Sequence, residues 1–275
     1  MTPSALLREG EKILGSSGVA RPRWTAEQLL ARRLECEPLC LYLEPPPLRP
    51  QEELRFRADL AARAGGMPLQ YLLGEAAFYG REFLVGPGVF IPRPETELLI
   101  EEALGFITPS TIVVEVGTGS GAIAVTLALE RPARSVVAIE RSSTALGFAR
   151  RNAARHRAGL AFVQGDLAGP LRPASADLMV ANLPYLEPER AAGWPKELRW
   201  EPWMALDGGP GGLSVVRRLL PQAAAVLRPG GRLILEIGAG QAQRACRLAR
   251  PHRLAPERVV QDLAGLERVV VLWKN

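Results

Sequence analysis

The chain has 275 residues, of which 47% are hydrophobic, enough to bury a full α/β core beside one further small domain. No stretch approaches the apolar length of a membrane span, and Met1 to Gly10 has no apolar signal region, so we expect a cytoplasmic protein without a membrane partner. Three scattered cysteines predict neither a disulfide framework nor a metal site. The net charge of +5 is too modest to predict direct nucleic-acid binding.

The first quarter of the chain is predicted to be helical. Thr2 can cap a helix whose first residue is a proline, and the capping-box pattern at Thr25 predicts the start of a second helix. The proline-rich stretch Leu41–Pro50 is typical of a connection, and a further helix is expected over about 51–64. We therefore expect a small helical domain over residues 1–75.

A change of pattern follows the predicted helices. From Phe78 to Pro94, apolar residues alternate with glycine and proline, which predicts a β-hairpin, and we assign residues 76–97 to a hairpin linker. Over residues 98–275, predicted strands and helices alternate, which indicates an α/β domain with a mostly parallel sheet covered on both faces. The predicted strands are 111–116, 135–140, 160–164, 177–182, 232–237, 258–262 and 268–273.

A glycine-rich loop follows the first predicted strand of this domain. Gly117, Thr118, Gly119 and Gly121 lie directly before an expected helix, and such glycines allow a tight turn and close approach of a ligand to the backbone. Taken alone, this pattern is compatible with binding of a dinucleotide, with binding of another nucleoside, or with a turn that binds no ligand.

Carboxylates at successive strand ends narrow the choice of ligand. Glu140 ends the second strand, where it can accept hydrogen bonds from both ribose hydroxyls. Asp166, followed by Leu167, ends the third, where a carboxylate can accept from an adenine amino group. Glu115 at the loop suits a cationic amino acid moiety and would repel a pyrophosphate. These cofactor-binding candidates favour S-adenosylmethionine over NAD.

The fourth strand ends in Asn182, Leu183, Pro184 and Tyr185, beside the expected cofactor pocket. An asparagine close before a proline can be a simple turn. Alternatively, the Asn182 side-chain oxygen and the Leu183 carbonyl can accept hydrogen bonds from both N–H groups of an amide or aromatic amine. That contact would turn the poorly nucleophilic nitrogen toward a methyl group, while Tyr185 stacks on the planar group. We expect these four residues to be catalytic and substrate-binding, with Asn182 also contacting the cofactor.

Motifs along essentially the whole chain resemble the HemK/PrmC family of protein-glutamine methyltransferases, which modify class 1 peptide-chain release factors. The motifs that carry this resemblance are Pro68-Leu69-Gln70-Tyr71-Leu72-Leu73-Gly74, Phe78-Tyr79-Gly80-Arg81-Glu82-Phe83, Ile91-Pro92-Arg93-Pro94-Glu95-Thr96-Glu97, Glu201-Pro202, Gly208-Gly209, Gly211-Gly212-Leu213, Leu227-Arg228-Pro229-Gly230-Gly231, Glu236-Ile237-Gly238 and Asp262-Leu263-Ala264-Gly265.

The resemblance implies a Rossmann-like class I methyltransferase domain of seven strands, the last antiparallel, and an N-terminal domain that recognises the release factor. The substrate would be the glutamine of the Gly-Gly-Gln motif, and S-adenosylhomocysteine would be the second product. Arg93, Pro94 and Thr96 would line the cofactor and substrate cleft and are expected to bind the substrate. This chain has Leu183 where the family has the first proline of Asn-Pro-Pro-Tyr, and glutamate where aspartate is commoner at Glu115 and Glu140.

Three alternatives remain open at the level of sequence. The first alternative is that the chain is a related enzyme, one that methylates a glutamine of a large-subunit ribosomal protein. A nucleic-acid adenine methyltransferase would also use an Asn-x-Pro-Tyr segment, but it would need a flipped base and a more basic surface. A binding protein that kept the fold without activity is the third, and retention of Asn182 and the cofactor carboxylates counts against it.

Overall fold

The computed structural model describes residues 2–275, which form two compact units. The helical unit contains residues 2–75 together with the distant segment Pro195–Trp200. The sheet unit contains Ala76–Trp194 and Glu201–Asn275. The return of a short segment from the second half of the chain to the helical unit is not visible in the sequence pattern.

The helical unit buries a small core of its own, formed largely by Leu6, Leu7, Leu30, Phe56 and Leu60, none of which is exposed to solvent. The predicted first cap is confirmed, because the hydroxyl of Thr2 accepts a hydrogen bond from the Ala5 N–H at 3.3 Å. The helices of this unit are α1 (Pro3–Ser16), α2 (Pro22–Leu34), α3 (Cys40–Leu43), α4 (Pro50–Ala64) and α5 (Leu69–Leu73).

Two sequence predictions in this unit were wrong. The second helix begins at Pro22 instead of Thr25, because the fixed φ of proline suits the first helical position, and Thr25 is buried within the helix. The expected connection at Leu41–Pro50 overlaps the short helix α3, which forms because Leu41 is buried in the core of the unit. Burial thus overrode local turn and capping signals.

A two-stranded hairpin, β1 (Glu75–Phe78) and β2 (Arg81–Leu84), begins at the last residue of the helical unit and leads into the sheet unit. Tyr79 and Gly80 form its turn with φ angles of 49° and 69°, as a tight two-residue hairpin requires. The hairpin was predicted to extend to Pro94, but in the described chain no strand follows Leu84 until Ile112. The partner strand β1 has only four residues and begins directly after α5, so the pairing of β2 ends at Leu84.

The main sheet has seven strands in the order β5-β4-β3-β6-β7-β9-β8. The strands β5, β4, β3, β6 and β7 are parallel, and β9 is antiparallel to both of its neighbours, which confirms the expected reversed last strand. The bounds are β3 Ile112–Val116, β4 Ser135–Glu140, β5 Ala161–Gln164, β6 Ala176–Asn182, β7 Leu227–Glu236, β8 Leu254–Gln261 and β9 Glu267–Lys274.

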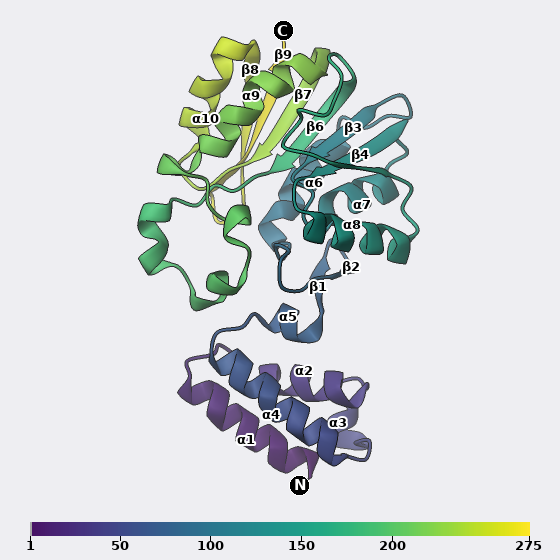
Figure 1. Ribbon diagram of the computed structural model, residues 1–275, viewed down its shortest axis with the longest axis vertical. Helices are drawn as coiled ribbons and strands as arrows, with labels where there is room; N and C mark the ends of the chain where they lie inside the picture. The colour runs from purple at the N-terminus through teal and green to yellow at the C-terminus, as the bar shows by residue number, and fades with distance from the viewer. Residues whose placement is uncertain (1) are drawn as a thin grey trace. The chain divides into compact units, whose positions relative to one another are not determined.

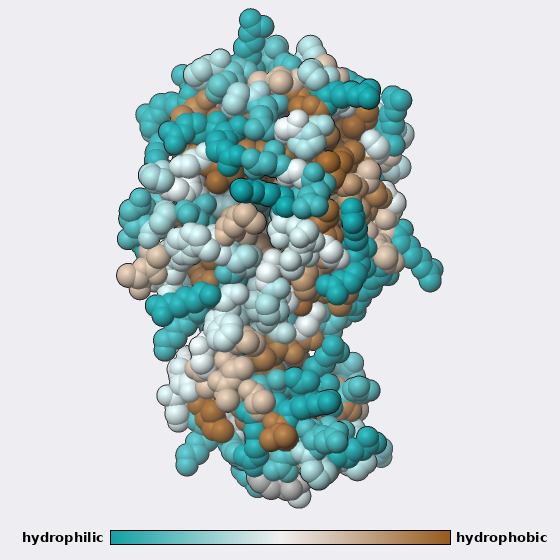
Figure 2. All heavy atoms as spheres, viewed as in Figure 1, coloured by the Kyte–Doolittle hydropathy of each residue, from teal (hydrophilic) through white to brown (hydrophobic). Residues whose placement is uncertain are grey.

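Helices cover both faces of this sheet (Figure 1). One apolar cluster joins the sheet to α6 and α7, and the other joins it to α9 and α10. No helix among residues 2–275 is both long and apolar enough to cross a membrane, and Figure 2 shows polar and apolar residues interspersed over the face it presents. The bounds are α6 Glu97–Leu104, α7 Ala122–Glu130, α8 Ser143–His156, α9 Ser214–Val226 and α10 Ala242–Ala249.

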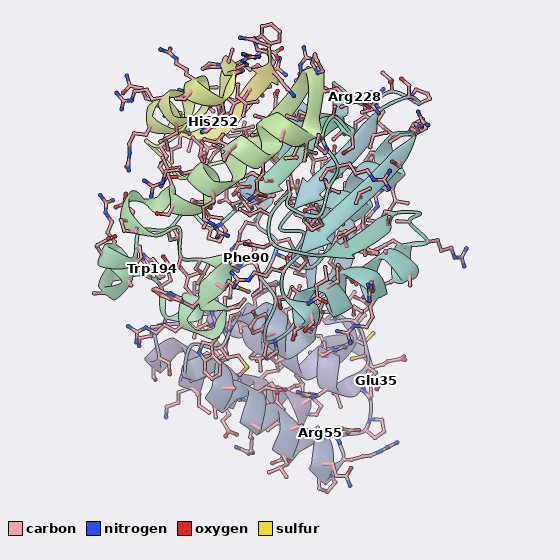
Figure 3. All side chains as sticks on the ribbon, turned by 45° about the horizontal axis from the view of Figure 1, so that its top comes forward. Glu35, Arg55, Phe90, Trp194, Arg228 and His252 are labelled. Carbon is pink, nitrogen blue, oxygen red and sulfur yellow. The ribbon has the colours of Figure 1, made fainter. Side chains whose placement is uncertain are left out.

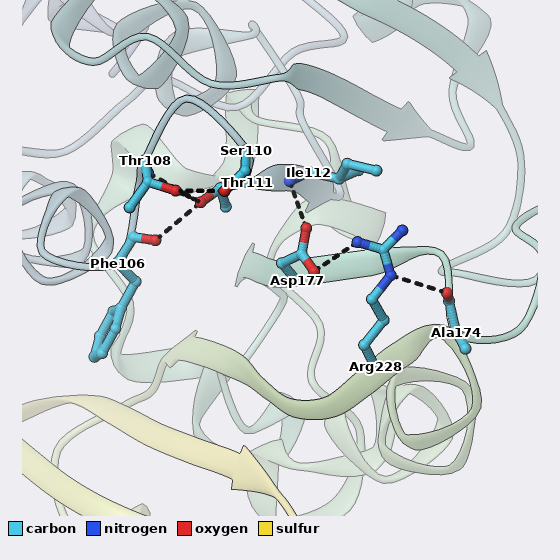
Figure 4. Close-up of polar contacts among 8 residues, drawn as sticks. All are labelled: Phe106, Thr108, Ser110, Thr111, Ile112, Ala174, Asp177 and Arg228. Atoms are coloured by element: carbon cyan, nitrogen blue, oxygen red, sulfur yellow. Dashed lines mark hydrogen bonds and ion pairs between the residues drawn. The ribbon is translucent and has the colours of Figure 1, made fainter.

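A polar cluster holds the amino ends of the central strands (Figure 4). Asp177 at the start of β6 accepts a hydrogen bond from the Ile112 N–H of β3 at 2.8 Å and an ion-pair contact from Arg228 of β7 at 2.7 Å. Arg228 also donates to the carbonyl of Ala174 at 3.2 Å. This cluster fixes three strands at the edge opposite to their carboxyl ends, where the predicted site residues gather.

Candidate functional site

The glycine loop connects β3 to α7 through residues in the left-handed backbone region. Gly117 and Gly121 have φ angles of 78° and 83°, which favour glycine. A Cβ on Gly121 would lie 3.0 Å from the Cα of Ala149 in α8, and one on Gly117 would lie 3.2 Å from a methyl carbon of Leu183. Close packing on α8 and on the loop after β6 therefore requires glycine at these two positions.

Asn152 of α8 holds the glycine loop in place. The sequence alone did not indicate this role. Asn152 is fully buried, and its Nδ2 donates to the carbonyl of Ser120 at 2.8 Å and to that of Leu84 at 3.0 Å. Its Oδ1 accepts from the Leu84 N–H at 2.7 Å. All the polar groups of this amide are thus used to join the hairpin to the glycine loop. An asparagine inside an otherwise amphipathic helix was the signal available in the sequence.

Glu115, the acidic residue before the loop, is fully buried. Its Oε2 accepts hydrogen bonds from the Thr118 hydroxyl and from the Ala124 N–H, the latter at 2.9 Å. Its Oε1 is buried with no partner among residues 2–275. Burial raises the pKa of Glu115 to about 7, although the two hydrogen bonds act in the opposite direction. A cationic group of a ligand would satisfy both the unpaired oxygen and the buried charge.

Glu140 lies at the carboxyl end of β4, next to the glycine loop. Its Oε2 accepts from the Gly119 N–H at 2.9 Å and its Oε1 accepts from the Ser142 N–H at 2.8 Å. Each carboxylate oxygen has a second lone pair, so Glu140 can still accept hydrogen bonds from a ligand. Its backbone partners hold the carboxylate in one orientation.

Asp166 and Leu167 follow β5, the outermost strand on this side of the sheet. The Asp166 carboxylate is exposed and forms an ion pair with Arg218 of α9. Leu167 is buried, with a φ angle of 54°. Among the described residues, the structure gives Asp166 no hydrogen bond to the glycine loop or to Glu140.

Asn182 is half-buried at the end of β6, with its backbone paired to Glu236 at the end of β7. Its Nδ2 donates a hydrogen bond to the Thr96 hydroxyl at 3.0 Å. Within the described chain, its side-chain oxygen has no hydrogen-bond partner. Thr96 is buried, so this hydrogen bond helps to hold the Asn182 side chain in place.

The residues after Asn182 are held closely by two other loops. Leu183 is buried, and its side chain fills the space beside Gly117. The Tyr185 carbonyl accepts from Gln241 Nε2 at 3.0 Å, and a Cβ on Gly212 would collide with that same carbonyl. Because Gly212 has no side chain, the backbone of the loop before α9 packs directly on the segment Asn182–Tyr185.

The Tyr185 hydroxyl donates to Glu236 Oε1 at 3.3 Å, and burial raises the pKa of Tyr185. Glu236 is itself 2% exposed, and its Oε2 is buried without a partner in the described chain. Burial raises the pKa of Glu236 to about 7, against the opposing effects of the Thr96 and Tyr185 hydroxyls. Sequence reasoning did not assign Glu236 to the site, although an acidic end to the apolar strand beside Asn182 was a usable signal.

Arg93 forms an ion pair with the buried carboxylate of Glu201. The guanidinium lies 4.9 Å from the ring centroid of Phe90, which is labelled in Figure 3. Glu201 also accepts from the Ile91 N–H at 3.0 Å, so it holds the segment that leads to Pro94. Pro94 begins the 3-10 turn Pro94–Thr96, which carries Thr96 to Asn182.

Comparison with protein families gives matches to two domains. The model described as the PrmC N-terminal domain matches residues 5–74, and the model described as the methyltransferase small domain matches residues 83–193. The two matches lie on either side of the hairpin turn.

Similar curated proteins cover almost the full length. The chain is 42% identical over 284 residues to a release factor glutamine methyltransferase of Moorella thermoacetica, which covers 100% of this chain and 99% of the relative. It is 39% identical over 259 residues to a protein of the same name from Geobacter sulfurreducens, with 94% and 91% covered. A third protein of that name, from Cereibacter sphaeroides, is 41% identical over 276 residues, with 98% of each chain covered.

Solved structures with lower identity share the fold. A methyltransferase from Pyrococcus furiosus aligns with a TM-score of 0.54 and 16% identity, over 82% of this chain and 98% of the other. A ribosomal protein L11 methylase from Lactobacillus delbrueckii subsp. bulgaricus aligns with a TM-score of 0.52 and 20% identity, over 70% and 84%. At these identities, the likeness shows the α/β methyltransferase fold alone.

Proposed function

This chain belongs to the family of release factor glutamine methyltransferases, and we propose that it methylates the glutamine of the Gly-Gly-Gln motif in class 1 peptide-chain release factors. The methyl donor in this proposal is S-adenosylmethionine, and the acceptor is the side-chain amide nitrogen of that glutamine. The observation that carries the proposal is Asn182, an amide oxygen without a partner at the end of β6, close beside the glycine loop.

The residues around the glycine loop fit S-adenosylmethionine. The unpaired buried oxygen of Glu115 matches the cationic amino acid part of this molecule, and Glu140 has lone pairs for the ribose hydroxyls. A Cβ on Gly119 would meet open space, so the backbone there is accessible to a ligand. We assign Gly117, Thr118, Gly119 and Gly121 to the cradle, with Asp166, Leu167 and Asn182 completing the cofactor-binding set. When bound, this cofactor supplies an electrophilic methyl group on a sulfonium.

The chain's own contribution to the reaction is positioning of the acceptor amide. The Asn182 side-chain oxygen and the Leu183 carbonyl accept hydrogen bonds from the two N–H groups, which orients the nitrogen and enriches its electron density. Pro184 and Tyr185 shape the slot, and Tyr185 is held by its bond to Glu236. Arg93, Pro94 and Thr96 form the segment that supports or borders this slot. The amide proton leaves after transfer, so no strong base is needed beforehand.

The two compact units correspond to separate tasks in this proposal. Residues 1–75 recognise the release factor as a protein substrate, residues 76–97 are a linker with the hairpin, and residues 98–275 carry methyl transfer. No membrane partner and no direct nucleic-acid contact enter the proposed cytoplasmic reaction.

The test is transfer of labelled methyl from S-adenosylmethionine to a purified class 1 release factor. A matched release factor with alanine in place of the Gly-Gly-Gln glutamine is the control. Label on the first and none on the second supports both the reaction and the target. If cofactor binding is measurable and neither protein is labelled, the proposal fails, and a ribosomal protein glutamine becomes the next acceptor to test.

A further inference from the structure

One stripe of side chains on α8 holds the strand β2 and the residues that follow it (Figure 1). The stripe residues are spaced four apart, and the positions that face them are spaced two apart. Two residues of a strand and four residues of a helix both advance by about 6–7 Å, so strand and helix stay in register. The facing pairs are His156 with Glu82, Asn152 with Leu84, Phe148 with Gly86 and Thr144 with Gly88.

The stripe residues differ in what else they bind. The Glu82 carbonyl accepts a hydrogen bond from His156 Nε2 at 2.8 Å, while Phe148 and Thr144 pack against glycines. Asn152 bonds the segment and also the glycine loop. Among residues 2–275, the side chains of the other three stripe residues make no hydrogen bond to that loop. Asn152 is therefore the junction between the loop and the β2 segment.

Backbone groups of Leu84 set the direction of the Asn152 amide. Asn152 Oδ1 accepts from the Leu84 N–H at 2.7 Å, and Nδ2 donates to the Leu84 carbonyl at 3.0 Å. A reversed amide would place an oxygen against a carbonyl and a donor against an N–H group. The paired backbone of one residue thus decides that the NH2 group faces the glycine loop.

The same NH2 group fixes a peptide group of the loop. The Ser120 carbonyl accepts from Asn152 Nδ2 at 2.8 Å, and the Gly121 N–H of that same peptide group donates to the Thr118 carbonyl at 2.7 Å. Gly121 has a φ angle of 83°, and glycine by itself restricts the backbone little. The orientation of the Ser120–Gly121 peptide group therefore depends on its hydrogen-bond partners.

We propose that Asn152 is a positioning residue that couples the cofactor-binding glycine loop to the β2 segment, which leads on to Thr96 and so to Asn182. Asn152 is fully buried, so it acts through the Ser120–Gly121 peptide group and not by contact with a ligand. Because coupling between two sites is reciprocal, a cofactor that binds the loop in this orientation also stabilises the bonds from Asn152 to Leu84. This inference rests on the proposed function for its ligand, S-adenosylmethionine, but it needs no methyl acceptor.

The test compares two variants on the same face of α8. Asn152→Leu removes all three hydrogen bonds of the amide at nearly constant size. His156→Phe is the matched control: it removes the bond to the Glu82 carbonyl and keeps a ring beside Phe83, whose centroid lies 5.0 Å from that of His156. Both variants weaken the contact of α8 with β2, and Asn152→Leu alone also releases the glycine loop.

Calorimetric titration with S-adenosylmethionine is the first measurement, at a temperature where both variants are folded. We expect the affinity to fall about tenfold or more in Asn152→Leu, the size of one lost hydrogen bond, and to change by less than about twofold in His156→Phe. A purely structural role would lower the unfolding midpoint of both variants without this difference in affinity. Unchanged affinity in Asn152→Leu, or equal losses in the two variants, would overturn the proposal.

The second measurement uses the wild type, so it does not depend on the folding of Asn152→Leu. By NMR, hydrogen exchange of the Leu84 amide should slow about threefold or more when S-adenosylmethionine is bound. His156→Phe should keep this response. If exchange is unchanged with the cofactor bound, the coupling is rejected. Absence of cofactor binding to the wild type contradicts the proposed function as well, whereas coupling without release factor methylation contradicts only the proposed substrate.

Discussion

At the scale of single residues, three buried or half-buried groups belong to the candidate site: Glu115, Asn182 and Glu236. The two carboxyl groups are costly to bury, and each keeps one oxygen without a partner in the described chain. Such unpaired buried groups are rare in folded proteins and gather at functional sites. Their position at the ends of β3 and β7 places them on either side of Asn182 at the end of β6.

Replacement of Asn182 by alanine removes the proposed acceptor for the amide N–H. We expect kcat to fall about a hundredfold or more, because loss of a single oriented hydrogen-bonding group in an active site has effects of this size. Cofactor affinity, measured by calorimetry, should change little. Undiminished turnover would remove Asn182 from the mechanism.

The raised pKa of Glu115 makes stability depend on pH. Its pKa of about 7 in the folded protein lies above the ordinary value of 4.5, so between these values the folded state holds a proton that the unfolded state has lost. The resulting stabilisation is complete below the ordinary pKa and disappears as the pH rises through about 7. Glu236 adds a contribution of the same sign.

We therefore expect Glu115→Gln to flatten this dependence. Urea unfolding at about pH 5.5 and about pH 7.5 should show a fall in the free energy of unfolding that is smaller in the variant by about 1–2 kcal/mol. A fall of equal size in both proteins would mean that Glu115 titrates normally.

At the scale of elements, the two ends of the central strands have different roles. Their carboxyl ends hold the candidate site, and their amino ends are joined by Asp177, Arg228 and the Ile112 N–H (Figure 4). Because the strand β3 has five residues, these ends are separated by roughly 15 Å of rigid sheet. Changes at the amino end should therefore affect stability without altering the site.

Asp177→Ala tests this division. It leaves the Ile112 N–H without its acceptor and Arg228 without its ion pair, so we expect a loss of about 1–2 kcal/mol in the free energy of unfolding. The pair is partly exposed, which limits its share of that loss. Well below the unfolding transition, kcat and cofactor affinity should match the wild type. A large kcat defect would show that the strand ends are coupled.

At the scale of the whole molecule, two units with separate hydrophobic cores share one chain. The segment Pro195–Trp200 leaves the sheet unit and joins the helical unit, where Arg63 contacts Glu197 at 3.1 Å. A chain cut after residue 75 would therefore strip this segment of its packing partners, so truncation is a poor test of what the helical unit does.

Ligand binding in the full chain is a better probe of the two units. S-adenosylmethionine at about a hundred times its Kd should stabilise the state that binds it by about 2.7 kcal/mol. By hydrogen exchange, we expect added protection in peptides of β3, β4 and α7, and little in peptides of α1, α2 and α4. Equal added protection in both units would mean that they unfold as one cooperative body.

The sequence predicted well what depends on local pattern. The strand segments, the reversed last strand, the Thr2 cap and the gathering of Glu115, Glu140 and Asn182 at strand ends are visible as periodicity, glycine spacing and family motifs. The error at Thr25 arose where a local capping signal competes with burial, and the error after Leu84 arose because the length of a hairpin depends on its partner strand. The ion pair of Asp166 with Arg218 was equally invisible, because it joins residues far apart in the chain.

By itself, the sequence determined the fold class, the likeness to a methyltransferase family and the residue types at the strand ends, since each is written in local pattern. Only the tertiary structure decided which of those residues support one another. Asn152 reaches the glycine loop, and Thr96 reaches Asn182, across elements that are distant in the chain. Hydrogen-bond direction and burial depend on groups brought together by packing, and no spacing in one segment specifies them.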